Sequence, residues 1–221
     1  MLSPAELPSL TAQPKRKILA DLDRNVDIPC LATGLHPALT SPPLDQTVTD
    51  GTAAVFLCQT DGAPKPAITW RKGGRVLASG AVQVPRFTLL QSGGLQIQPV
   101  SFQDSGEYTC VASNAEGTVN ATSTLTVWTR TVISVPPSDQ RVIKGTTATL
   151  DCNATHDPRV NISFRWDRGG VLVRPTNGGR VSMRRGSLTI GQTWSGDIGD
   201  YTCTVTSQSG NDSGSARLEV M

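Results

Sequence analysis

A seven-residue motif occurs twice in this chain and limits the possible folds more than any other feature. It reads DSGEYTC at Asp104–Cys110 and DIGDYTC at Asp197–Cys203, 93 residues apart. Each copy follows a cysteine and a tryptophan at similar distances, which are Cys58 and Trp70 for the first copy and Cys152 and Trp166 for the second. A period of this length predicts two copies of one structural unit.

The repeat divides the chain into three parts. A length of 221 residues fits one or two domains, and the repeat favours two, residues 38–128 and 131–221. Residues 1–37 contain a strand-like run ending at Cys30, which looks like the start of a further unit. That unit has no tryptophan and no second cysteine. We therefore predict a truncated, weakly ordered remnant, with Cys30 as a free thiol.

Alternating apolar residues predict short β-strands in both units. In GTAAVFLC the inward set is Ala54, Phe56 and Cys58, and GTTATLDC repeats this pattern. Glycine, proline, asparagine and aspartate separate the runs, and no stretch shows sustained helical spacing. KGGR and RGG are interpreted as hairpin turns, not phosphate loops, because no helix follows them. The predicted fold class is all-β.

The repeated cysteines form two pairs by position, Cys58 with Cys110 and Cys152 with Cys203. A bridge closing a loop of this length stabilises a unit by about 4 kcal/mol in the chain-entropy model. The tryptophan of each unit is expected to pack on its bridge. Cys…Trp…Cys at this spacing is the signature of the immunoglobulin sandwich. With a Pro-Pro kink near the start of each unit, both copies resemble the I-set type.

The repeated motif has a structural explanation in this fold. Its tyrosines, Tyr108 and Tyr201, are expected to point inward while their hydroxyls bond backbone upstream. Its aspartates need cationic partners, and we predict the ion pairs Arg86–Asp104 and Arg180–Asp197. A structural role for these pairs is favoured over binding or catalysis.

Four N-glycosylation signals accompany the paired cysteines, and both features indicate an oxidising, extracellular compartment. The signals begin at Asn120, Asn153, Asn161 and Asn211. Each lies out of phase with the inward residues of its segment or in a turn, so each is expected to face solvent. The chain has no apolar run of 18 residues and no signal-peptide-like apolar stretch near its start.

Catalytic, metal-binding and cofactor-binding patterns are missing from the sequence. His36 and His156 lie more than a hundred residues apart, and neither has cysteine, glutamate or histidine nearby at metal spacing. A net charge of +2 gives no case for nucleic acid as a partner. The basic residues Arg180, Arg184 and Arg185 are interpreted as a solvated strand edge in preference to a site for sulphated glycans or anionic lipid. We predict no enzyme, no cofactor and no small-molecule substrate.

Several longer strings carry a narrower resemblance, and they are GAPKPAITW, LASGAVQVPRFTLL, SGGLQIQPV, VIKGTTATL, THDPRV and QTWSGDIGDYTC. In these strings the chain resembles the sidekick family of cell-adhesion molecules. It implies a type I plasma-membrane protein with six immunoglobulin domains followed by fibronectin type III domains, acting in homophilic adhesion at neuronal synapses. This chain would hold the fifth and sixth immunoglobulin domains and a stub of the fourth. Because the family's recognition is ascribed to the distal domains, the expected role is that of a spacer in the ectodomain.

Two other functions remain open at this stage. A soluble ligand-binding or decoy receptor module would use an exposed contact residue, and Trp194 in TWSGD is the candidate. An intracellular muscle-type scaffold would also use I-set domains, but the glycosylation signals and cysteine pairs argue against it.

Overall fold

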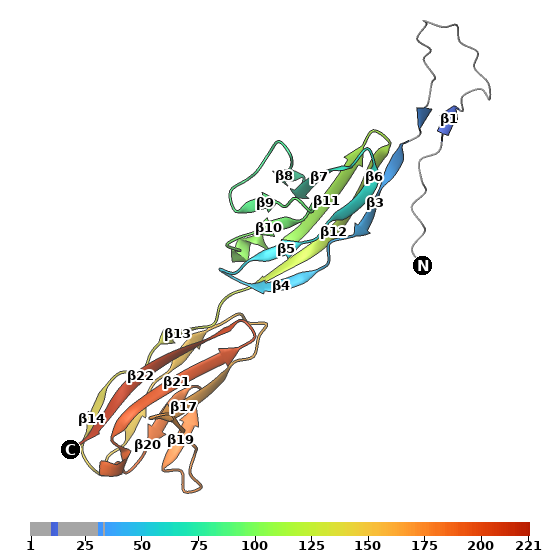
Figure 1. Ribbon diagram of the computed structural model, residues 1–221. Coiled ribbons are helices and arrows are strands. Elements are labelled where there is room, and N and C mark those ends of the chain that lie inside the picture. Colours follow the sequence, from blue (N-terminus) through green and yellow to red (C-terminus); the bar gives the residue numbers. More distant parts are fainter. Residues whose placement is uncertain (1–9, 13–30, 33) are drawn as a thin grey trace, which may run out of the picture. The chain divides into compact units, whose positions relative to one another are not determined.

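The structure, a computed structural model, describes residues 10–12, 31–32 and 34–221. Cys30 and most of the predicted remnant lie outside the described residues, although strand β1 (Leu10–Ala12) pairs antiparallel with β2 (Leu31–Ala32). The chain forms two compact units. The second contains Val127–Met221 together with the short segment Val48–Asp50, and the first contains the described residues up to and including Thr126 apart from that segment (Figure 1).

The first unit is a sandwich of two sheets. One face combines β3 (Leu35–Ser41) paired with β6 (Gln59–Ala63), and β5 (Ala54–Phe56), β10 (Leu95–Ile97) and β9 (Phe87–Leu89) in that order. The other contains β4 (Gln46–Thr49), β12 (Gly117–Trp128), β11 (Gly106–Asn114), β7 (Ala67–Lys72) and β8 (Arg75–Ala78). A 3-10 turn, η1 (Phe102–Asp104), precedes β11.

The second unit repeats this topology strand for strand. One face combines β13 (Val132–Val135) paired with β16 (Asn153–Thr155), and β15 (Ala148–Leu150), β20 (Ser187–Ile190) and β19 (Val181–Arg184). The other contains β14 (Gln140–Val142), β22 (Gly210–Val220), β21 (Gly199–Ser207), β17 (Ser163–Arg168) and β18 (Val171–Leu172). The turn η2 (Ser195–Asp197) corresponds to η1.

A proline pair moves the first strand of each unit from one sheet to the other. In the second unit, β13 pairs antiparallel with β16, Pro136 and Pro137 follow, and β14 then pairs parallel with β22. Proline has no N–H to donate to a sheet, so hydrogen bonding stops where the chain crosses. Pro42 and Pro43 occupy the same place between β3 and β4.

Two-glycine turns join β7 to β8 and β17 to β18. Gly73 and Gly74 have φ values of 54° and 80°, and Gly169 and Gly170 have 54° and 82°. Positive φ at both central residues matches the twist of a tight hairpin, which explains the glycine pairs. The sequence indicated only the turns, whereas the structure adds the short edge strands β8 and β18 after them.

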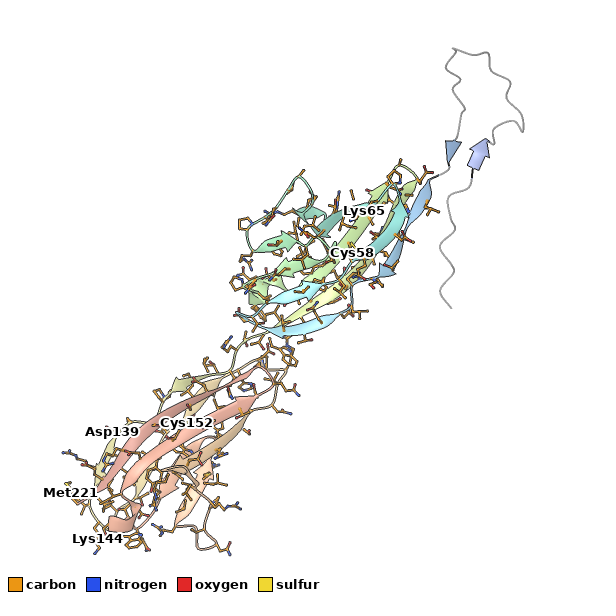
Figure 2. The ribbon with its side chains drawn as sticks, in the orientation of Figure 1. Cys58, Lys65, Asp139, Lys144, Cys152 and Met221 are labelled. Atoms are coloured by element: carbon orange, nitrogen blue, oxygen red, sulfur yellow. A yellow bond between two sulfur atoms is a disulfide. The ribbon has the colours of Figure 1, made fainter. Side chains whose placement is uncertain are left out.

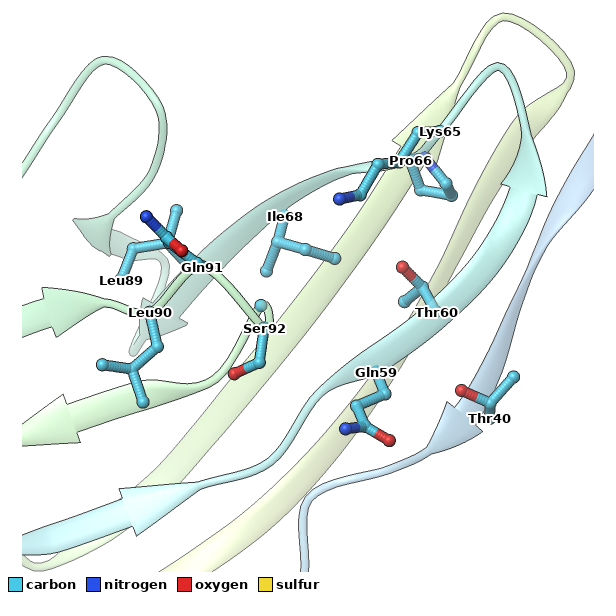
Figure 3. A pocket seen from close by; sticks show the side chains of 11 residues that line it. Thr40, Gln59, Thr60, Lys65, Pro66, Ile68, Leu89, Leu90, Gln91 and Ser92 are labelled. Atoms are coloured by element: carbon cyan, nitrogen blue, oxygen red, sulfur yellow. The ribbon is translucent and has the colours of Figure 1, made fainter.

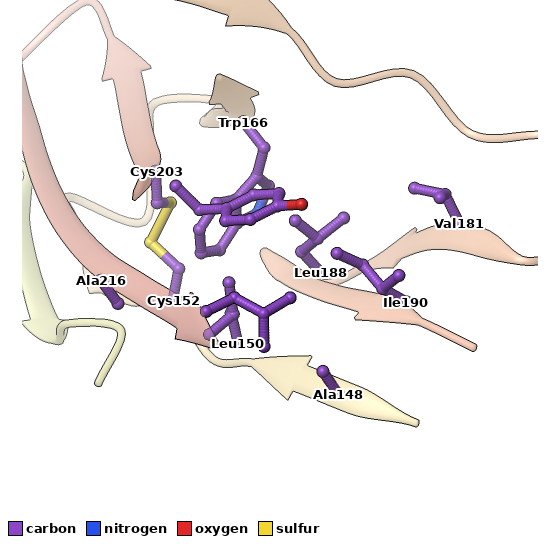
Figure 4. Close-up of a cluster of buried hydrophobic side chains, with 11 residues drawn as sticks. Ala148, Leu150, Cys152, Trp166, Val181, Leu188, Ile190, Cys203 and Ala216 are labelled. Atoms are coloured by element: carbon purple, nitrogen blue, oxygen red, sulfur yellow. A yellow bond between two sulfur atoms is a disulfide. The ribbon is translucent and has the colours of Figure 1, made fainter. Parts of the chain in front are cut away.

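Each core is built around a bridged cysteine pair and a tryptophan. Trp70 stands opposite Cys110 in the sheet register, and Trp166 stands opposite Cys203. All four side chains are fully buried. In the second unit, Figure 4 shows Val181 and Ile190 at the end of this cluster away from the bridge. The predicted fold class, two I-set sandwiches, is confirmed; β3 begins at Leu35, ahead of the predicted start at residue 38.

Candidate functional sites

A buried carboxylate, that of Asp104, holds the first corner, which is the turn η1 where the chain enters β11. Arg86 donates from Nη1 to Asp104 Oδ2 at 2.7 Å and from Nη2 to Oδ1 at 3.1 Å. The backbone N–H of Ser101 donates to Oδ2 at 2.7 Å, and the Tyr108 hydroxyl donates to the Asp104 carbonyl at 2.7 Å. The carboxylate thus fixes both ends of η1, while the tyrosine ties the turn to β11.

Electrostatics at this corner favour the ionised carboxylate. Burial raises the pKa of Asp104, but the hydrogen bonds from Arg86 and from the Ser101 backbone outweigh burial and hold the pKa below its usual range. Burial likewise raises the pKa of Tyr108, and the negative charge of Asp104 adds to that effect. The tyrosine hydroxyl therefore keeps its proton at physiological pH and acts as a neutral hydrogen-bond donor.

The second corner repeats the design. Arg180 Nη1 lies 3.1 Å from Asp197 Oδ1 and 2.9 Å from Oδ2. The backbone N–H of Trp194 donates to the same carboxylate at 3.0 Å, and the Tyr201 hydroxyl donates to the Asp197 carbonyl at 2.8 Å. Both predicted ion pairs are present; each carboxylate also accepts a hydrogen bond from a backbone N–H, and the tyrosine binds the backbone carbonyl of the same aspartate. These contacts are those of a structural clamp.

Sequence analysis missed a second cation at each corner. Lys72 Nζ donates to three consecutive backbone carbonyls that close η1, those of Gln103, Asp104 and Ser105, at 2.8–3.3 Å, and lies 5.1 Å from the centre of the Tyr108 ring. Arg168 Nη1 donates to the Gly196 carbonyl at 2.6 Å. Both cations stand two residues after the core tryptophan, so the signal was a repeated W-x-(K/R) spacing.

The two cysteine pairs form disulfides in the structure. Cys58–Cys110 and Cys152–Cys203 each have a Cα–Cα distance of 6.5 Å (Figure 2). The tryptophan beside each bridge also anchors a turn, because Trp70 Nε1 donates to the Gly93 carbonyl at 2.9 Å. Trp166 Nε1 does the same to Gly186 at 2.8 Å. The indoles therefore contribute burial and a satisfied polar group together.

The four asparagines of the glycosylation signals are all exposed. Asn120 lies on β12, Asn153 on β16, Asn211 on β22, and Asn161 just before β17. Exposure makes each of them accessible to modification of the folded chain.

Trp194 is partly exposed and held in place. Its side chain is 53% accessible, and its ring lies against Gly196, where an added Cβ would meet the indole. Glycine at this position therefore lets the ring fold back over η2. The arrangement combines the two interpretations of Trp194, since one part of the indole covers the corner and the other faces solvent.

The histidines form no reactive cluster. His36 Nδ1 lies 3.0 Å from the Pro37 carbonyl, and His156 Nδ1 lies 2.8 Å from the Asp157 carbonyl. Over residues 34–221, with 10–12 and 31–32, no group of three metal-ligating side chains lies together. No helix among these residues is long and apolar enough to span a bilayer.

Beside His156, sequence analysis missed a local ion pair in the D-P-R segment. Arg159 Nη2 lies 2.7 Å from Asp157 Oδ2, and the backbone N–H of Thr129 donates to the same oxygen at 3.0 Å. The side chain of Asp157 is only 1% exposed. The hydrogen bond from Arg159 lowers the pKa of Asp157; burial opposes this effect without cancelling it.

A groove of about 600 Å³ opens on the first unit (Figure 3). It lies among β3, β6, β7 and the turn after β9. Its lining contains one charged side chain, Lys65, and includes no carboxylate, histidine or cysteine. General acid–base or nucleophilic chemistry needs such groups in pairs, so this groove has no catalytic constellation.

Comparison with known proteins agrees with these features. The model of the immunoglobulin I-set domain family matches residues 37–127 and 131–220. Sidekick-1 of Homo sapiens is 57% identical over 190 residues, covering 86% of this chain and 9% of that protein. Sidekick-2 of Mus musculus is 53% identical over 189 residues, covering 85% and 9%. The chain thus spans about a tenth of the length of these curated relatives.

Among solved structures, extracellular domains 3–5 of Drosophila OTK have a similar fold. The TM-score is 0.64 and the identity 26%, with 84% of this chain and 62% of that one covered.

Proposed function

Since the chain belongs to the sidekick family of the immunoglobulin superfamily, we propose that it is a non-catalytic spacer segment in the ectodomain of a synaptic, homophilic cell-adhesion molecule. The observation that carries the proposal is the 57% identity to sidekick-1 across both bridged units. The parent protein is proposed to be anchored in the plasma membrane, and its partners to be other cell-surface proteins of the same family.

The extracellular location rests on the bridges and the glycosylation signals. Disulfides persist in oxidising compartments, and both pairs are bonded in the sandwich cores. We further propose N-linked glycans at the four exposed asparagines. Intact mass of the secreted chain before and after peptide-N-glycosidase treatment tests this, and an unchanged mass contradicts it.

Bead aggregation tests the spacer role. Beads coated with this chain are expected to stay dispersed, whereas beads coated with a complete family ectodomain are expected to clump. Clumping by this chain alone would show that it adheres by itself, and the spacer role would be wrong.

A soluble ligand-binding module is the second candidate, and the half-exposed indole of Trp194 favours it. Exposed tryptophans are frequent anchors of protein interfaces. Trp194→Ala would then abolish partner capture with little change in thermal unfolding. A melting temperature that falls by several degrees would instead assign the indole to covering η2.

A further inference from the structure

The second unit contains a cavity lined by residues of β17, β18, β19, β20 and β21. The cavity measures about 280 Å³ and opens to solvent beside β18. Its apolar wall consists of Val171, Leu172, Val173, Val181, Ile190 and Tyr201. Val181 and Ile190 are opposite each other in the register of β19 and β20.

In the first unit, a phenylalanine occupies the equivalent position. Phe87 stands opposite Ile97, as Val181 stands opposite Ile190. Its ring is buried, with its centre 6.5 Å from that of Tyr108. Valine lacks this ring, and the cavity of the second unit is lined by Val181 and by Tyr201, the equivalents of Phe87 and Tyr108.

A cation is already positioned over that space. In the first unit the guanidinium of Arg86 lies 5.3 Å from the centre of the Phe87 ring. Arg180 is the equivalent residue, is held by Asp197, and lines the cavity. Aromatic rings are attracted to cations placed over their faces. The second unit therefore has the cation of this pair but no ring.

The residues around the mouth of the cavity indicate the chemistry of a group that could bind there. Val171 is 71% and Leu172 42% exposed, which provides apolar contact area at the mouth. Arg168 also lines the cavity, as does Asp197, whose carboxylate is paired with Arg180. Arg174, which follows Val173, and Arg184, on β19, are both exposed, and neither has an acidic partner among residues 34–221. This side of the unit is thus positively charged and complementary to acidic residues.

We propose that this cavity is a docking site for a phenylalanine or tyrosine side chain carried in an acidic segment of a partner protein. The ring enters between β18 and β19, contacts Tyr201 and lies under Arg180. The flanking carboxylates face Arg168 and the unpaired arginines. The proposal is independent of the spacer role, because it concerns a partner of different chemistry bound to one unit.

Titration of the chain with the peptide acetyl-Glu-Phe-Glu-amide, followed by two-dimensional amide NMR, tests the proposal. We expect saturable shifts at millimolar peptide, concentrated at residues 171–173, 181 and 190. The peptides acetyl-Glu-Ala-Glu-amide and acetyl-Lys-Phe-Lys-amide serve as controls and are expected to bind at least about tenfold more weakly. Equal shifts with either control, or none with the first peptide, would overturn the proposal.

Two variants locate the site. Val181→Phe fills the cavity with the residue that the first unit uses, and it is expected to remove the saturable shifts. Leu172→Asp changes the exposed mouth, weakens binding and leaves folding intact, so a folding failure of the first variant does not end the test. Binding unaffected by both variants would contradict the proposed place. Shifts that appear on concentration without peptide would identify a second copy as the occupant and also overturn it.

Discussion

The two units share a frame and differ in how they fill it. Bridge, tryptophan, tyrosine, aspartate and arginine occupy equivalent places in both. Around the tyrosine, however, the first unit has Phe56, 5.3 Å from Tyr108 between ring centres, and Phe87. The second has Leu150 and Val181. The comparison teaches that a few framework residues determine the sandwich, while neighbouring core positions can vary from close-packed rings to a cavity.

The opposite ends of the sandwiches differ as well. In the first unit the amide of Asn114 donates to the carbonyls of Leu35 and Pro64 at 2.8 and 2.9 Å. In the second, Ser207 holds the equivalent place, four residues after the cysteine of the motif, and shares a hydroxyl cluster with Thr131 and Ser209. The second unit adds the buried Asp157, which pairs with Arg159, whereas the amide of Asn114 binds neutral carbonyls.

Removing a bridge is expected to have the largest effect, and an equal one in both units. The closed loops have sequence separations of 52 and 51 residues, so loop closure predicts a loss of about 4 kcal/mol in the free energy of unfolding for each. Cys58→Ala with Cys110→Ala, and the matching pair in the second unit, test this by unit-resolved amide hydrogen exchange. Losses differing by more than about 2 kcal/mol would show that the frames are not equivalent.

Exchanging phenylalanine and valine between the two equivalent core positions tests whether the difference in ring packing explains the cavity. Phe87→Val is expected to cost about 2 kcal/mol, because it removes buried ring contacts and leaves a void. Val181→Phe is expected to change stability by less than about 1 kcal/mol, because the space exists already. Urea denaturation of both variants measures this. A large loss for Val181→Phe would mean that the cavity is too narrow for the ring, and the units would then differ in backbone as well as in side chains.

Sequence reasoning predicted the frame because each framework residue leaves a local signal. Alternation placed Phe56 and Cys58 inward, and the repeated motif identified the clamps at Asp104 and Asp197. The role of Lys72 was missed because its partners are backbone carbonyls, and every residue has a carbonyl whatever its side chain. The cavity was missed for a related reason: Val181 looks like an ordinary core residue until the strands show what faces it.

A smaller effect is expected at the opposite ends. Asn114→Ala leaves two carbonyls without their donor and is expected to cost about 1–2 kcal/mol. Ser207→Ala is expected to cost about 1 kcal/mol or less, because Thr131 and Ser209 remain bonded at 3.0 Å. Thermal unfolding of the two single variants checks the order. A greater loss for Ser207→Ala would indicate that the hydroxyl cluster acts as one cooperative network.

Lowering the pH is expected to reveal the contribution of Asp157 to the stability of the second unit. Near neutral pH this is the smallest of the effects predicted. The pKa of Asp157 is lowered by its hydrogen bond from Arg159, so the folded state binds this proton less readily than the unfolded chain does. The stabilisation is therefore present above the usual carboxyl range near pH 4, and it is lost as pH falls toward the lowered pKa.

The variant Asp157→Asn should flatten the acid dependence of the second unit only. The first unit, in which the pKa of Asp104 is lowered and which the substitution does not touch, serves as the control within the same molecule. Hydrogen exchange from pH 5 to about pH 2.5 measures both slopes. If the slope of the second unit is unchanged, Asp157 is not the group that titrates there, and its buried ion pair would not distinguish the two units in acid.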